Sequence, residues 1–91
     1  MKGSREQRLT IKNRLGLHAR AASMIVQISN RYKANIIVEK DGIAADGKSI
    51  MGLLMLAAGK GSKIVIKAEG PDAEEAIDDL TRLIEGKFGE E

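Results

Sequence analysis

One stretch of the sequence contains the two patterns that decide the fold: QRLTIKNRLGLHARAASMIVQIS, residues 7–29. Polar and apolar residues alternate from 7 to 12, which predicts a half-buried strand with Leu9 and Ile11 facing inward. Gly16 then marks a turn. From Leu17 to about Ser29 the apolar residues recur at three- and four-residue steps, so we expect a helix with one buried stripe.

The rest of the chain continues this alternation of strands and helices. Strands are predicted at residues 34–39, 43–45 and 62–69. A short apolar helix is expected from Ser49 to the glycines at 59–61, and a longer one from Asp72 to Gly86, where Asp72 and Glu75 are typical of a capping box. The order βαββαβα predicts an α+β fold, an open two-layer sandwich with three helices on one side of a four-stranded antiparallel sheet.

The composition predicts one globular domain, residues 1–91, with an ordered core of about 7–85. With 43% hydrophobic and 31% charged residues, neither disorder nor a membrane span is expected. Tyr32 and Phe88 are the only aromatic residues, so we expect an aliphatic core. Two aromatics also make a poor stacking platform, which disfavours nucleic acid as a partner. The default expectation for the chain is a monomer.

The absence of cysteine excludes disulfides, cysteine-ligated metals and thiol nucleophiles. The single histidine excludes a histidine-rich metal site within one chain, and no cofactor is expected. Because no apolar run follows the first residues, no secretory signal is predicted, and the expected location is the cytoplasm.

Charge is divided unevenly along the chain. Residues 1–48 carry ten Lys and Arg against four Asp and Glu, a balance of +6, whereas residues 49–91 carry five against nine, a balance of −4. This split predicts either a basic surface for an acidic partner or a phosphate, or two sets of charges that folding intermixes.

His18 and Arg20 are the residues most suited to chemistry. A helix N-terminus offers unpaired N–H groups and favours an anion, and a neutral imidazole has a lone pair that can attack phosphorus. Arg20, two residues later, can reach the same place and bind phosphate oxygens. The pair describes a site for a phosphorylated imidazole; the alternative is that His18 only caps the helix or packs on it.

Ser49 precedes an apolar run and is first of all a helix N-cap. A phosphate at that position would be tolerated by the helix and would repel an acidic partner, and Lys48 could assist either role. The run after Ser49 is more apolar than one buried stripe requires, so some of its side chains are expected on the surface, where a partner could bind.

Residues 13–22 (NRLGLHARAA) and 47–54 (GKSIMGLL), in register on the predicted element order, closely resemble the HPr family. These are the histidine-containing phosphocarriers of the bacterial phosphoenolpyruvate-dependent phosphotransferase system for sugar transport. The resemblance extends from about Gln7 to Ile84.

The resemblance implies that His18 is phosphorylated on Nδ1 by phosphorylated enzyme I and passes the group to EIIA domains. Arg20 matches the active-site arginine, and Ser49 matches the serine modified by HPr kinase/phosphorylase. Such a protein is a carrier and not an enzyme. The resemblance and the position of the site together imply a partner-binding surface made of Leu17, Ala19, Lys48, Ile50, Met51 and Leu54.

Two residues depart from the family pattern. Ala21 stands where the family usually has proline, and Gln27 stands in a stretch that commonly carries a basic residue. The alternatives are therefore a regulatory HPr paralogue that is not coupled to sugar uptake, or a small-ligand-binding regulatory domain on a similar fold.

Overall fold

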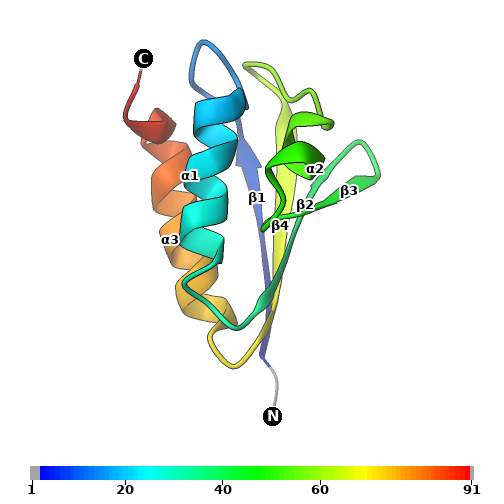
Figure 1. Ribbon diagram of the computed structural model, residues 1–91, viewed down its shortest axis with the longest axis vertical. Helices are drawn as coiled ribbons and strands as arrows, with labels where there is room; N and C mark the ends of the chain where they lie inside the picture. The colour runs from blue at the N-terminus through cyan, green and yellow to red at the C-terminus, as the bar shows by residue number, and fades with distance from the viewer. Residues whose placement is uncertain (1–2, 91) are drawn as a thin grey trace.

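The computed structural model describes residues 3–90, which form a four-stranded sheet covered on one face by three helices (Figure 1). The strands are β1 (Gly3–Thr10), β2 (Asn35–Lys40), β3 (Ile43–Asp46) and β4 (Lys63–Gly70). The helices are α1 (Ala19–Ser29), α2 (Ile50–Leu54) and α3 (Ala73–Glu85), followed by the short 3₁₀ turn η1 (Lys87–Gly89). Neighbouring strands are antiparallel in the order β1-β4-β2-β3. The predicted α+β sandwich is confirmed.

The first strand lies further toward the N-terminus than the predicted residues 7–12. It pairs with β4 along its whole length, from Gly3 opposite Gly70 to Thr10 opposite Lys63. Residues 4–8 are all polar and exposed, so they give no pattern of apolar alternation. A strand pairs through its backbone groups, which every residue except proline can supply in full. Pairing therefore extends the sheet to residues outside the predicted core of 7–85.

The core lies between the sheet and the helices. Ile64 and Ile66 of β4 are buried beneath the helices, and α3 buries its predicted apolar stripe, including Leu80 and Ile84. The expectation of a purely aliphatic core is wrong at one position, because Phe88 in η1 is fully buried. A helix long and apolar enough to cross a membrane is not found among residues 3–90.

The second helix is shorter than the apolar pattern predicts. It ends at Leu54, and Ala57 then adopts a positive φ of 51°, well before the glycines at 59–61. This turn presents the Ala58 carbonyl to the loop before α1, where it accepts a hydrogen bond from the Leu17 N–H at 2.8 Å. The early end of α2 thus builds a contact with the segment that precedes His18.

The capping box predicted at the start of α3 does not form. Asp72 is the N-cap residue, but its side chain makes no capping hydrogen bond. Its two carboxylate oxygens instead accept hydrogen bonds from the backbone N–H groups of Lys33, at 2.8 Å, and Ala34, at 2.9 Å. These bonds connect the start of α3 to the segment between α1 and β2.

Candidate functional site

His18 stands at the N-terminus of α1 in an extended conformation. The first hydrogen bond of the helix is donated by the Ala22 N–H to the His18 carbonyl at 2.8 Å. The N–H groups of residues 19–21 therefore come before the first i to i−4 hydrogen bond of α1. The imidazole makes no capping hydrogen bond, and its side chain is 26% exposed. The ring is therefore not used as a helix cap, and it lies beside N–H groups that favour an anion.

The loop before α1 is held by two residues that place His18. Asn13 is fully buried, and its Nδ2 donates to the Gly16 carbonyl at 2.7 Å. Gly16 has a φ of +67°, and an added Cβ would lie 2.6 Å from the Ala58 carbonyl oxygen. Only glycine suits both the backbone conformation and this close approach. The turn expected at Gly16 is confirmed and is part of the site.

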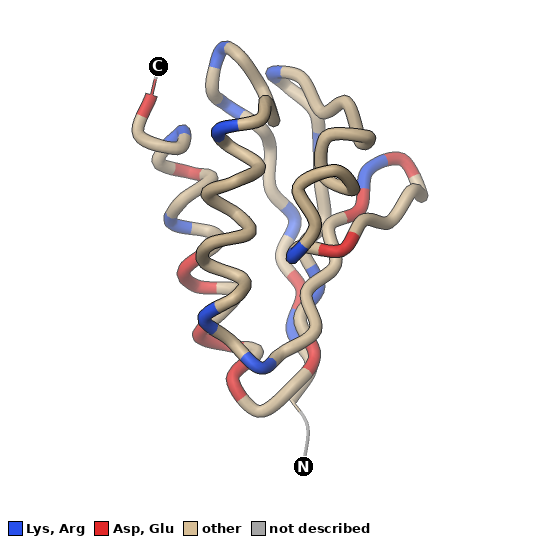
Figure 2. The backbone as a smooth tube through the Cα atoms, in the orientation of Figure 1, with Lys and Arg blue, Asp and Glu red and all other residues tan. Residues whose placement is uncertain are grey.

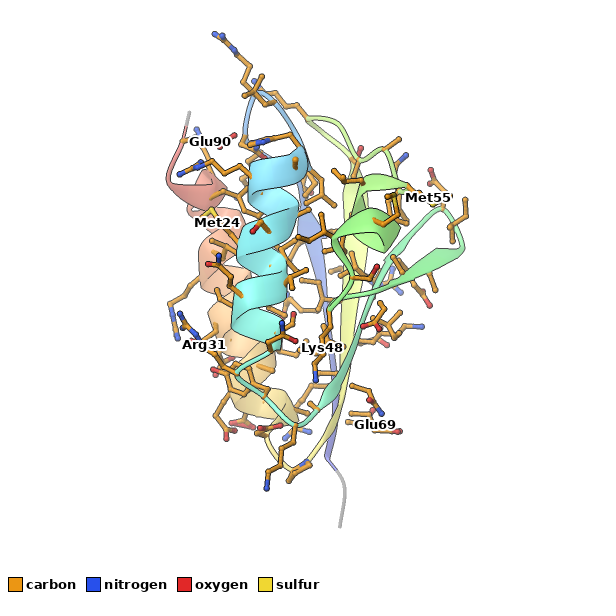
Figure 3. All side chains as sticks on the ribbon, in the orientation of Figure 1. Met24, Arg31, Lys48, Met55, Glu69 and Glu90 are labelled. Atoms are coloured by element: carbon orange, nitrogen blue, oxygen red, sulfur yellow. The ribbon has the colours of Figure 1, made fainter. Side chains whose placement is uncertain are left out.

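Glu90 from the C-terminal segment completes the cluster around His18. Its Oε1 and Oε2 lie 2.9 and 3.0 Å from His18 Nε2. Arg20 donates to Oε2 at 2.9 Å, and Asn13 Nδ2 donates to Oε1 at 2.7 Å. Figure 3 shows Glu90 at the end of the molecule where α1 begins. The structure thus brings His18 and Arg20 together, as predicted, through a carboxylate that no motif indicated.

The Glu90 carboxylate is stabilised in its ionised form. The hydrogen bond from Asn13 is the main influence that holds the pKa of Glu90 below its usual value, and His18 and Arg20 lower it further against the opposing effect of desolvation. A negative group therefore faces Nε2 of the imidazole at neutral pH. Among residues 3–90, no cluster of three or more acidic or histidine side chains could hold a metal ion.

Ser49 lies outside this cluster and caps α2. Its Oγ accepts a hydrogen bond from the Gly52 N–H at 3.0 Å, which confirms the predicted N-cap. The neighbouring Lys48 directs its ammonium to the Tyr32 carbonyl at 3.0 Å, beyond the end of α1 (Figure 3). The two candidate phosphorylation sites are thus built separately, each at the N-terminus of a helix.

The predicted partner-binding residues divide between the surface and the core. On α2, Ile50 and Met51 are exposed and Leu54 is half-buried, while Ala19 is exposed at the start of α1. Leu17 is only 5% exposed because it packs into the core, as the apolar stripe that begins at Leu17 predicts, so its side chain offers little surface to a partner. Among residues 3–90, three further large apolar residues are strongly exposed: Leu15 at 67%, Ile43 at 62% and Met55 at 76%. Met55 lies in the apolar run after Ser49, where some surface side chains were expected, whereas no pattern indicated the exposure of Leu15 and Ile43. Figure 3 shows Met55 on the outer side of α2.

Folding intermixes part of the uneven charge. Arg5 pairs with Glu74, Glu39 with Lys67 and Arg20 with Glu90, so each pair joins the basic half of the chain to the acidic half. Figure 2 shows Lys and Arg on the loop before α1 and on the loop before β4, and neither loop carries Asp or Glu. Positive charge therefore persists at the end of the molecule that holds His18.

Most of the chain matches a known protein family. Residues 5–86 match the family model described as the PTS HPr component phosphorylation site. The chain belongs to the HPr family. The phosphocarrier protein HPr of Cupriavidus necator is 46% identical over 81 residues, which are 89% of this chain and 91% of that protein. The crystal structure of an HPr from Thermoanaerobacter tengcongensis is 47% identical, with a TM-score of 0.92 over 96% of this chain and 98% of that one.

One solved HPr relative bears on regulation and assembly. The Bacillus subtilis catabolite repression protein Crh is 36% identical, with a TM-score of 0.74 over 89% of this chain and 93% of that one, and its structure is described as a swapped dimer. Because a member of this fold family is a dimer, family membership does not support the expectation of a monomer.

Proposed function

We propose that this HPr carries a phosphoryl group on His18, accepting it in the cytoplasm from phosphorylated enzyme I and passing it to EIIA domains. The proposal rests on one observation: the partly exposed His18 ring lies at the start of α1, next to Arg20 and ahead of the helical hydrogen-bond ladder. The Nδ1 lone pair attacks phosphorus as the bond from phosphorus to the donor breaks. Arg20 and the N–H groups of the helix start stabilise the phosphoryl oxygens.

The strength of these contacts suits a carrier. A charge at a helix terminus contributes about 0.3–1 kcal/mol. Arg20 has a side chain that is 61% exposed, and an ion pair at such a position contributes no more than about 1 kcal/mol. If a contact of about 1.4 kcal/mol had to be broken before transfer, it would slow transfer about tenfold. Each of the contacts above is weaker than that, so together they hold the phosphoryl group without preventing its transfer.

The test of His18 is phosphorylation by enzyme I and phosphoenolpyruvate. We expect one acid-labile phosphate on the wild-type protein and none on His18→Ala, while Ser49→Ala serves as the control and retains the label. Subsequent addition of an EIIA domain should remove the phosphate. Label that persists on His18→Ala would refute the proposal.

We propose a second modification at Ser49, by an ATP-dependent HPr kinase/phosphorylase. The apolar side chains of Ile50 and Met51, exposed beside Ser49, support a role for this region in partner binding. A phosphate on Ser49 would add about −1.5 to −2 charges there and repel acidic partners. An acid-stable phosphate should appear with ATP and the kinase on wild-type protein and on His18→Ala, but not on Ser49→Ala.

The Ser49→Ala variant also loses its helix cap, at a cost of about 1 kcal/mol in the free energy of unfolding. Ser49→Asn is the matched control because asparagine caps a helix equally well and cannot take the phosphate. Both variants should lack the acid-stable phosphate, and only Ser49→Ala should unfold at a lower urea concentration. Acid-stable phosphate on Ser49→Asn would contradict the assignment.

A regulatory role without sugar transport is the second candidate, and the similarity to Crh favours it. Both branches use the same fold, so the phosphorylation pattern must distinguish them. Rapid transfer from His18 to an EIIA domain supports the transport branch. Modification of Ser49 by the kinase, with no transfer from His18 to any EIIA domain, supports the regulatory branch.

A further inference from the structure

The C-terminal segment places a carboxylate on one particular atom of His18. Glu90 Oε1 and Oε2 lie 2.9 and 3.0 Å from Nε2, and the Glu90 side chain is 18% exposed. Nδ1 has no hydrogen-bond partner within residues 3–90. The two ring nitrogens thus have different surroundings, and the difference is set by a residue 72 positions away from His18 in the chain.

Three features hold the Glu90 carboxylate in this place. Phe88 is fully buried and fixes the segment after α3 to the core. Asn13, also fully buried, donates Nδ2 to Glu90 Oε1 at 2.7 Å, and Arg20 donates to Oε2 at 2.9 Å. The carboxylate is therefore held from several directions, which a freely rotating surface glutamate would not be.

An ionised carboxylate can only accept hydrogen bonds, so the nitrogen that faces it must carry the hydrogen. In a neutral imidazole one nitrogen carries the hydrogen and the other has the lone pair. We propose that Glu90 is a positioning residue that keeps the hydrogen of His18 on Nε2 and the nucleophilic lone pair on Nδ1. This inference rests on the proposed phosphocarrier function and assigns Glu90 a role in it.

The same contact assists the transfer step. As the Nδ1–phosphorus bond forms, the bond from phosphorus to the donor breaks and its electron pair stays with the donor. The hydrogen remains on Nε2, and the imidazole gains positive charge. Glu90 faces that charge, as a carboxylate behind the catalytic histidine does in serine proteases. In the second transfer the acceptor attacks phosphorus, the Nδ1–phosphorus bond breaks, and its electron pair returns to Nδ1 of His18.

The tautomer of His18 can be measured directly, because the chain has a single histidine. Two-bond ¹⁵N–¹H correlation spectra at about pH 8.5, where imidazoles in general are neutral, report which nitrogen carries the hydrogen. We expect wild-type protein to show the Nε2–H form alone and Glu90→Ala to show a mixture with the Nδ1–H form. Glu90→Gln should remain close to the wild-type tautomer, because its amide oxygen still accepts a hydrogen bond.

Transfer rates separate the charge of Glu90 from its hydrogen bond. The rate of phosphorylation by phosphorylated enzyme I should fall about 10-fold in Glu90→Ala and less in Glu90→Gln, as for other residues that orient a functional histidine. Glu85→Gln is the matched control: it removes an exposed carboxylate at the end of α3 and should change neither the tautomer nor the rate.

An unchanged tautomer in Glu90→Ala would overturn the proposal for Glu90, even if His18 is phosphorylated normally. A changed tautomer together with an unchanged transfer rate would overturn the role of Glu90 in transfer. A wild-type protein that shows the Nε2–H form but is never phosphorylated on His18 would refute the proposed function itself.

Discussion

At the scale of single residues, the loop before α1 depends on Asn13 and Gly16. Gly16 supplies the positive φ and the space next to the Ala58 carbonyl, and Asn13 binds both the Gly16 carbonyl and Glu90. The sequence indicates a turn at Gly16 but gives Asn13 no special role. Its role follows from burial, because a buried amide that binds two separate segments fixes their relative position.

Replacement of Gly16 tests this local geometry. In Gly16→Ala the new Cβ would lie 2.6 Å from the Ala58 oxygen, at a φ of +67° that alanine rarely adopts. We expect a loss of more than about 1 kcal/mol in the free energy of unfolding, together with slower phosphorylation of His18. Urea denaturation and the phosphorylation assay measure the two effects.

Gly59→Ala is the matched control, because an added Cβ at Gly59 meets no heavy atom within 4 Å. Its stability should stay within about 0.5 kcal/mol of the wild type. Equal stability losses in the two variants would show that the close approach at Gly16 is not the cause.

At the scale of elements, each helix start in this protein has its own use. Ser49 caps α2 in the predicted way, whereas Asp72 binds the segment between α1 and β2, and the start of α1 stays open beside His18. The capping residue predicted from the sequence forms its capping hydrogen bond in α2, whereas the capping box predicted for α3 does not form. Both helices are preceded by a residue of a type that commonly caps helices. The segments that lie nearby in the fold decide which N–H groups donate hydrogen bonds to its side chain.

The Asp72 contact should make stability depend on pH. Hydrogen bonds from the N–H of Lys33 and then of Ala34 hold the pKa of Asp72 below its usual value of 3.8. Because the folded-state pKa is the lower one, this stabilisation is fully present above 3.8 and is lost as the pH falls through the lowered folded value. The urea concentration at the unfolding midpoint should therefore fall as the pH is lowered from 3.8 through the folded-state pKa of Asp72.

The Asp72→Asn variant isolates this contribution. It should be less stable than the wild type at neutral pH, and its stability should decline less as the solution is acidified. Glu90, whose pKa is also lowered, is present in both proteins, so the difference between their pH profiles reports Asp72. Parallel pH profiles for the two proteins would contradict the assignment.

At the scale of the whole molecule, the two ends of the described chain have different roles. The N-terminal residues extend the sheet as β1, while the C-terminal residues return to the start of α1 (Figure 1). Phe88 makes the second arrangement stable, because its burial removes a large apolar side chain from water and fixes the segment that carries Glu90. The core and the candidate site therefore share one anchor.

Truncation of Phe88 should affect stability and the site together. We expect Phe88→Ala to lower the free energy of unfolding by about 3–5 kcal/mol, because the side chain is fully buried. Loss of the anchor should also release Glu90 and shift the His18 tautomer as in Glu90→Ala. Phe88→Leu, which keeps much of the apolar volume, should show a smaller loss of stability and retain the tautomer.

Urea denaturation and the ¹⁵N spectra of His18 provide both measurements for the Phe88 variants. Unchanged stability in Phe88→Ala would mean that the burial of this ring contributes nothing to folding. A folded Phe88→Ala protein with the wild-type tautomer would mean that Glu90 does not need the anchor.

The sequence by itself determined the order of strands and helices, the turn at Gly16, the cap at Ser49 and the nearness of His18 to Arg20. Each of these depends on residues that lie within a few positions of one another, and local periodicity and hydrogen bonding leave a pattern in the sequence. The tertiary structure decided the early start of β1, the burial of Phe88, and the contact of Ala58 with Leu17. It also placed Glu90 on Nε2 of His18, 72 residues away. Contacts over such distances leave no local pattern, because they form only when the helices pack on the sheet and bring distant segments together.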